Sequence, residues 1–113
     1  MNGFIMDRVI YVAGKYRDKT EIGVYNNIQL ARLSAIRLWK LGWVVICPHL
    51  NTSFMGGIVS DEFFIESDLE LLSRSDAIFM LDNWEDSPGA NKEHALAQEL
   101  GIRIFYQKDG YPV

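Results

Sequence analysis

The stretch AIFMLDNWEDSPGANKEHALAQELGIRIFY, residues 77–106, contains two short apolar runs on either side of a helical pattern. Ser87 stands at the N-cap position, and Pro88 occupies the first helical position, where its missing N–H is not needed for an intrahelical bond. Gly101 ends the helix. The flanking runs, 77–81 and 103–106, are mostly apolar, as is typical of strands buried on both faces. The stretch therefore predicts a strand–helix–strand unit with parallel strands.

The same alternation extends back to the start of the chain. It predicts strands over 8–13 and 43–47, helices over 24–41 and 61–74, a loop over 49–60 and a polar tail over 107–113. The first helix shows an apolar face made of Ile28, Ala31, Ala35 and Leu38. Right-handed crossovers then favour one α/β domain over 1–113, Rossmann-like, with a flavodoxin-like strand order 2-1-3-4.

In this topology the first helix lies on one face of the sheet, and the other two helices lie on the opposite face. One helix is too narrow to cover four strands, so apolar surface remains for a partner subunit. We therefore predict a homodimer or a higher homo-oligomer.

Composition excludes several classes of protein. The chain has a net charge of −4, and between Asp61 and Asp86 its only basic side chain is Arg74. Because nucleic-acid polymers are bound by basic surfaces, none is expected as a partner. No apolar run spans a membrane, and Met1 to Val12 lacks the basic start of a signal peptide. Cys47 is the only cysteine, so no internal disulfide can form, which fits a cytoplasmic protein.

The predicted fold also places a binding site. Ligands of open parallel sheets bind beyond the carboxyl ends of the strands, at the point where the strand order reverses. The segments that meet there are 14–17, 48–51 and 82–86, together with the start of the helix that follows Ser87. A small molecule held by specific hydrogen bonds is the partner we expect at this point.

Three carboxylates and one phenol are candidates for chemistry at this site. Glu93 lies near a helix start, where the helix dipole favours its ionised form, and a fixed carboxylate can attack an electrophilic sugar carbon. Asp68 lies mid-helix among apolar residues, and Asp86 ends the loop before the last helix. Each also has a plain structural reading: a favoured charge at a helix start for Glu93, a solvated face for Asp68, a turn for Asp86 and core packing for Tyr11.

Paired carboxylates around a sugar are typical of glycosidic cleavage, and carboxylates that share a cleft raise each other's pKa, which favours one protonated member. Lys15 and Arg17 either neutralise a phosphate or are solvated loop charges. Neither a P-loop nor a GxGxxG pattern follows the first strand. Cys47, His49 and His94 form no cluster with metal-ligand spacing, so we expect no metal and no cofactor.

Three segments carry a family resemblance. Read in order, Ile10 to Gly14, Ser67 to Ile78 and Asp86 to Glu93 resemble the nucleoside 2-deoxyribosyltransferase superfamily, which includes the 2′-deoxynucleoside 5′-phosphate N-hydrolases. The segment from Trp84 to Ala95 is most similar to a small, uncharacterised phage and bacterial subgroup. The chain departs from the family in having Ala95 where glycine is usual, one more residue between Asp86 and Glu93, and almost no C-terminal extension.

The resemblance implies a role for each candidate. Glu93 takes the nucleophile position, Tyr11 orients it, and Asp68 and Asp86 serve the base and the sugar. Asp76 takes a structural aspartate position. The other residues predicted to contact the substrate are Gly14, Lys15, Tyr16, Arg17, His49 and Gly89.

Three functions remain open at this stage. The first is an N-glycosidic hydrolase or deoxyribosyltransferase acting on a nucleoside or its monophosphate. The second is a non-catalytic nucleotide binder, such as a sensor or a sequestering protein. The third is a protein-interaction module, which would be favoured if Trp84 or Phe54 filled the pocket.

Overall fold

Four short apolar segments form one parallel sheet in the computed structural model, which describes residues 8–113. The strands are β1 (Val9–Ala13), β2 (Val44–Ile46), β3 (Ala77–Met80) and β4 (Arg103–Tyr106). They lie in the order β2-β1-β3-β4, with every neighbouring pair parallel, which confirms the predicted order. Tyr11, at the centre of β1, is in register with Ile46 on one side and with Ile78 on the other.

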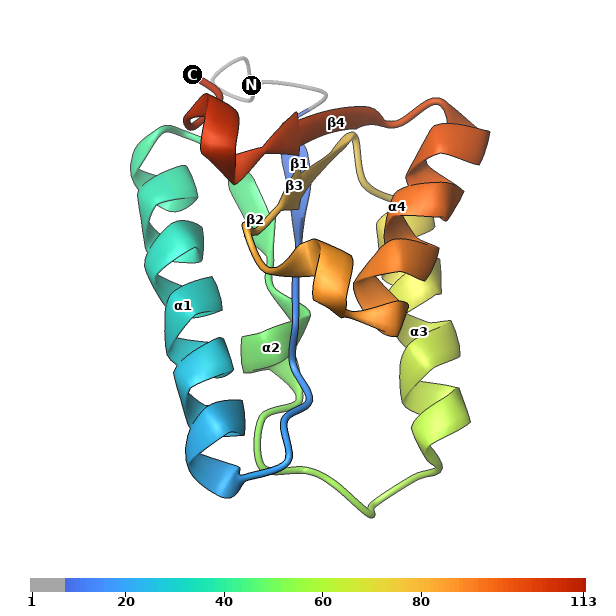
Figure 1. Ribbon diagram of the computed structural model, residues 1–113. Coiled ribbons are helices and arrows are strands. Elements are labelled where there is room, and N and C mark those ends of the chain that lie inside the picture. The colour runs from blue at the N-terminus through green and yellow to red at the C-terminus, as the bar shows by residue number, and fades with distance from the viewer. Residues whose placement is uncertain (1–7) are drawn as a thin grey trace, which may run out of the picture.

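Helices cover both faces of this sheet, as predicted. The helices are α1 (Glu21–Lys40), α2 (Pro48–Asn51), α3 (Asp61–Ser73) and α4 (Pro88–Leu100), with short 3-10 turns η1 (Trp84–Asp86) and η2 (Gln107–Asp109). Figure 1 shows α1 and α2 on one side of the strands and α3 and α4 on the other. In the same view β1 and β2 run downward from the end near the N-terminus, whereas β4 crosses the top of the view.

One helix prediction and one loop prediction were wrong in part. Helix α1 begins at Glu21, not at residue 24, because Thr20 caps it by accepting a hydrogen bond from the N–H of Gly23. The Asp18 carboxylate in turn accepts hydrogen bonds from the backbone N–H and the hydroxyl of Thr20. The segment predicted as a loop over 49–60 contains α2, a single turn that starts at Pro48. The alternation pattern does not detect an element this short.

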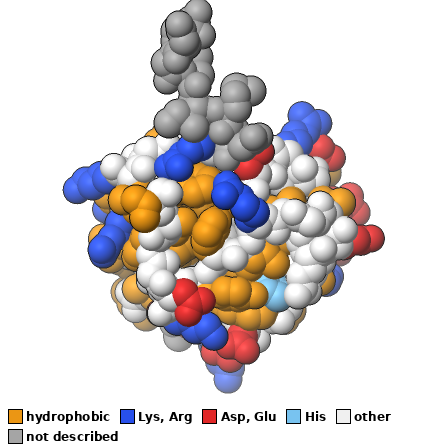
Figure 2. Space-filling model, turned by 90° about the horizontal axis from the view of Figure 1, so that it is seen from above, with side chains coloured by type: hydrophobic (Ala, Val, Ile, Leu, Met, Phe, Trp, Pro, Cys, Tyr) orange, Lys and Arg blue, Asp and Glu red, His pale blue; other side chains and the backbone are white. Residues whose placement is uncertain are grey.

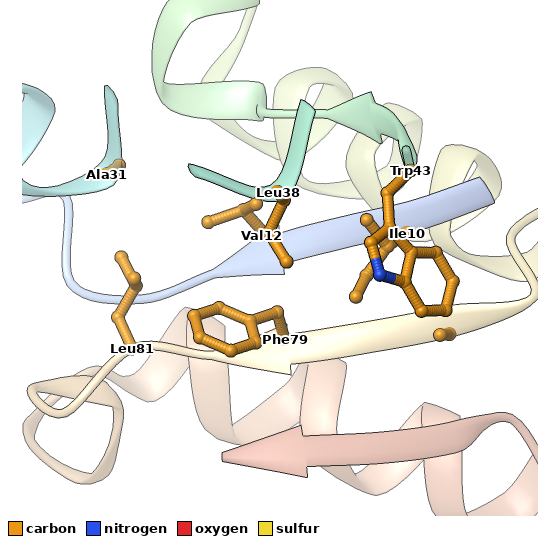
Figure 3. Close-up of a cluster of buried hydrophobic side chains, with 8 residues drawn as sticks. Ile10, Val12, Ala31, Leu38, Trp43, Phe79 and Leu81 are labelled. Carbon is orange, nitrogen blue, oxygen red and sulfur yellow. The ribbon is translucent and has the colours of Figure 1, made fainter. Parts of the chain in front are cut away.

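Alternate side chains of the strands form two separate cores. Ile10, Val12, Phe79 and their neighbours face α1, where Ala31 and Leu38 pack against them (Figure 3). Tyr11, Ala13, Ile78 and Met80 face the opposite way, toward α3 and α4. The period of two along a strand therefore decides that Tyr11 lies on the α4 side of the sheet. All four residues predicted for the apolar face of α1 are buried.

The polar tail predicted over 107–113 is ordered and packs on the sheet beside α1. Tyr111 stacks on Phe79 with ring centroids 4.9 Å apart, and its hydroxyl bonds to Ser34 Oγ at 2.8 Å. The indole N–H of Trp43 donates to the carbonyl of Pro112 at 3.0 Å. The tail thus shares in covering the face that was assigned to α1 alone.

The outer face of α1 exposes apolar side chains among charged ones. Ile22, Leu33 and Trp39 are 64%, 60% and 54% exposed. The homo-oligomer stays a prediction. Because the tail helps to cover the sheet, the surface available for a partner subunit is this outer face of α1 and not the sheet itself.

The end of the sheet at which the strands begin is closed by aromatic and cationic side chains. The guanidinium group of Arg8 lies 4.4 Å from the ring centroid of the buried Trp43 and donates to the carbonyl of Leu41. Figure 2 looks onto this end, where hydrophobic side chains are interspersed with Lys and Arg. Asp76 joins the starts of β1 and β3, because its carboxylate accepts from the N–H of Val9 and its own N–H donates to the Val9 carbonyl. This agrees with a structural role for Asp76.

No helix in the described part of the chain is long and apolar enough to cross a membrane. The first seven residues, over which the sequence predicts no signal peptide, lie outside the described residues.

Candidate functional site

A cavity of about 520 Å³ opens at the carboxyl ends of the strands, where the strand order predicts a site. Residues from the loops after β1, β2 and β3 and from helices α3 and α4 line it. Nine of the ten predicted site residues are among them: Gly14, Lys15, Tyr16, Arg17, His49, Asp68, Asp86, Gly89 and Glu93. The tenth, Tyr11, lies beneath the cavity and is fully buried.

Tyr11 and Glu93 are joined by a direct hydrogen bond. The hydroxyl of Tyr11 donates to Oε2 of Glu93, across the contact between β1 and α4. Burial, followed by the negative charges of Glu93 and Asp68, raises the pKa of Tyr11 well above its usual value, so the phenol keeps its proton. The bond occupies one oxygen of Glu93 and orients the carboxyl group at the floor of an open cavity.

The prediction that Glu93 is held ionised by the helix dipole was wrong. Burial raises the pKa of Glu93 to about 8, the hydrogen bond from Tyr11 opposes the rise, and the charge of Asp68 adds to it. The dipole acts mainly within the first turn of a helix, whereas Glu93 lies in the second turn of α4. Desolvation therefore decides the protonation state, and Glu93 is mostly protonated at neutral pH.

Asp68 projects from the middle of α3 toward the same cavity. Burial raises its pKa to about 6. Its charge acts on Glu93, so the two carboxyl groups titrate as a pair. Between about pH 6 and 8 this pair holds one proton. The expectation that carboxylates sharing the cleft raise each other's pKa holds in one direction: the charge of Asp68 raises the pKa of Glu93, whereas burial raises that of Asp68. Asp86, at the end of η1, is exposed and also lines the cavity.

The loop after β1 is held by contacts on both sides of its backbone. The N–H of Lys15 donates to Oδ1 of Asn83 at 2.9 Å, and the carbonyl of Lys15 bonds to Nε2 of His49 at 3.0 Å. Since a carbonyl only accepts, His49 Nε2 carries the proton. Burial lowers the pKa of His49, which keeps the imidazole neutral. Asn83 thus ties the loops after β1 and β3 together.

Gly14 is required by close packing at this edge of the sheet. A Cβ at this position would lie 2.5 Å from Leu81 Cδ1 and 2.9 Å from Asn83 Oδ1. Only glycine lets the chain turn away from β1 this close to β3.

The mouth of the cavity carries charges of both signs. Arg17 forms an ion pair with Asp61 at 3.5 Å, with both side chains largely exposed, and such pairs contribute little stability. Lys92 on α4 also lines the cavity. The first turn of α4 adds Gly89 to the lining. A Cβ built at Gly89 would meet only Ser87 Oγ, at 3.8 Å, so the helix start is open toward the cavity.

Sequence reasoning missed part of the site. The apolar lining from α3, Phe64, Ile65 and Leu69, reads as ordinary core, and Asn83 reads as a turn residue. Only the three-dimensional neighbourhood distinguishes them. Trp84 and Phe54 do not fill the cavity: Trp84 stacks on His94, and Phe54 is 86% exposed. The condition that would favour an interaction module is therefore not met.

No cluster of three His, Cys, Asp or Glu side chains among residues 8–113 is arranged to hold a metal ion. The polar groups of the lining residues are carboxyl, ammonium, guanidinium, hydroxyl, imidazole and backbone groups. These groups suit a polar organic ligand with an anionic part.

Comparisons with known proteins agree with this fold. A family model described as "Domain of unknown function (DUF4406)" matches residues 8–106, so the chain belongs to that family. The chain is similar in structure to a 2-deoxyribosyltransferase from the psychrotolerant bacterium Bacillus psychrosaccharolyticus, with a TM-score of 0.62 and 24% sequence identity over 87% of this chain and 70% of that one. At this identity the similarity shows a shared fold. A comparison with curated proteins gives no match.

Proposed function

We propose that this DUF4406 protein cleaves the N-glycosidic bond of a nucleoside or nucleoside monophosphate, with Glu93 as the nucleophile. The observation that carries the proposal is the hydrogen bond from the buried Tyr11 to Glu93 at the floor of the cavity. The solved structure that shares the fold is described as a 2-deoxyribosyltransferase, which supports the same class of chemistry.

The carboxyl pair supplies both groups that the first step needs. In the singly protonated pair the proton passes from Glu93 to Asp68, and the free Oε1 of Glu93 then forms a bond to C1′ of the sugar. The bond from C1′ to the base nitrogen breaks, and its electron pair leaves with the base. Asp68 delivers this proton to the departing base, directly or by way of the Asp86 carboxylate. Tyr11 holds Oε2 and leaves Oε1 free for attack.

The second step removes the sugar from Glu93. Water attacks C1′, the bond to Oε1 breaks, and the proton of the water returns to the carboxyl pair. If a second base attacks in place of water, the same site performs a transfer. Because hydrolysis and transfer differ only in this acceptor, both belong to the proposal.

Lys15 and Arg17 favour a substrate with a 5′-phosphate. Both line the cavity mouth, and the weak, exposed ion pair of Arg17 with Asp61 leaves the guanidinium group available to an anion. A monophosphate therefore fits this end of the site better than a neutral nucleoside.

The test is incubation of the protein with a panel of ribo- and deoxyribonucleosides and their monophosphates, with chromatography of the free base. The matched control pair is Glu93→Gln and Glu99→Gln, because Glu99 is an exposed glutamate on the same helix. We expect base release from wild type and from Glu99→Gln, and none from Glu93→Gln. Tight binding of a nucleotide without base release would replace the enzyme with a nucleotide binder.

A further inference from the structure

The turn that carries Asp86 borders two cavities. Turn η1 separates the large cavity from a smaller one of about 190 Å³. Asp86 faces the large cavity, whereas Trp84 and Glu85 line the small one together with Tyr106 and Lys108. Because open space lies behind η1, close packing alone does not fix its position.

Asn91 holds the backbone of this turn. Its side-chain Nδ2 lies 2.8 Å from the carbonyl oxygen of Ser87, 3.1 Å from that of Glu85 and 3.4 Å from that of Trp84. The two amide hydrogens thus serve three acceptors on both sides of Asp86. Asn91 does not line the large cavity, so its side chain is directed at the turn and not at a ligand.

His94 holds the side chain of Trp84 in this turn. It lies three residues after Asn91 and therefore on the same side of α4. Its ring stacks on Trp84 with centroids 4.4 Å apart, and its Nε2 bonds to the hydroxyl of Tyr106 at 2.7 Å. Tyr106 is the last residue of β4, so His94 connects the turn to the sheet.

We propose that Asn91 and His94 are positioning residues, which fix η1 and thereby aim Asp86 at the substrate held by Glu93. The inference rests on the proposed function, because it assigns Asp86 a part in the same reaction. Glu93 lies between the two residues on α4 but projects into the cavity. One rigid helix therefore sets the place of both carboxyl groups, one directly and one through the turn.

The kinetic test is a double-mutant cycle between Asn91→Ala and Asp86→Asn. Misplacement of a reacting group by about 1 Å lowers rates by about 10²-fold, so we expect Asn91→Ala to lower kcat by about 10- to 100-fold, with a smaller change in KM. In the Asp86→Asn background the same substitution should have little further effect, because the group that it positions is already lost. Full additivity would overturn the inference. Gln98→Ala, an exposed amide two turns further along the same face, is the control.

A second measurement does not depend on activity. NMR relaxation of the backbone amides of residues 84–87 reports directly on the order of the turn. We expect Asn91→Ala and His94→Ala to raise the mobility of this segment, His94→Phe to restore part of its order through stacking, and Gln98→Ala to leave it unchanged. If wild type releases no base, the proposed function fails, and the relaxation data still decide the inference. An equally ordered turn in Asn91→Ala would overturn it.

Discussion

Replacing Glu93 by Gln should stabilise the protein at high pH while it abolishes base release. Glutamine keeps the length of the side chain and an oxygen that accepts from Tyr11, but it has no charge to desolvate. Burial raises the pKa of Glu93 from its ordinary value of 4.5 to about 8. The folded state therefore binds the proton more tightly than the unfolded state, so stability is highest below about pH 4.5 and falls as pH rises through about 8.

The size of the effect follows from the shift. At about 1.4 kcal/mol per pKa unit, linkage sets an upper limit of about 5 kcal/mol above pH 8. Water that enters the open cavity screens the charge, so we expect Glu93→Gln to exceed wild type by about 1–3 kcal/mol at pH 9 and by less than about 1 kcal/mol at pH 5. For a domain of this size each 1 kcal/mol raises Tm by about 4–8 °C.

Urea unfolding of wild type, Glu93→Gln and Glu99→Gln at pH 5, 7 and 9 measures this difference. Glu99 is exposed, so its replacement should leave the pH dependence of unfolding as in wild type. A Glu93→Gln curve that runs parallel to wild type across this range would refute the argument that Glu93 is desolvated. Normal base release by a folded Glu93→Gln protein would refute its role as nucleophile.

Four further predictions follow from the site. The pH profile of kcat/KM should be bell-shaped with limbs near pH 6 and 8, because below this range the carboxyl pair lacks its charge and above it lacks its proton; a flat profile would exclude the pair. Tyr11→Phe removes the bond that lowers the pKa of Glu93, so a titration should show that pKa moved upward. Alanine at both Lys15 and Arg17 should weaken monophosphate binding by about 1.5–3 kcal/mol in calorimetry and leave nucleoside binding unchanged. Light scattering at micromolar concentration should give at least a dimer mass; a monomer mass would contradict the predicted homo-oligomer.

Most of the fold was predictable because parallel sheets leave a strong local pattern. Continuous apolar strands, the Ser87-Pro88 helix start and the Gly101 helix end are local signals, and crossover handedness leaves few ways to join them. Two features were not predicted. Helix α2 is a single turn, which is too short to show a helical period. The early start of α1 depends on the Asp18–Thr20 cap.

The position of the site was predictable from the sequence, but the protonation state of its residues was not. Strand order brings the loop residues together, and nine of the ten predicted site residues line one cavity. The protonation of Glu93 was not predictable, because the local sequence shows the helix start, whereas the burial of Glu93 and the nearby charge of Asp68 are tertiary properties. The same holds for Asn83 and Asn91, whose amides act on loops that no sequence spacing connects to them.

The packing of the last residues has a practical consequence for protein production. Val113 is 92% exposed, so an affinity tag or fusion partner joined after it meets no steric obstacle. Shortening the chain to Gly110 would remove the ring that covers Phe79 and leave Trp43 Nε1 and Ser34 without their partners. Expression of such a shortened chain should yield aggregated material even though every helix and strand of the sheet is retained.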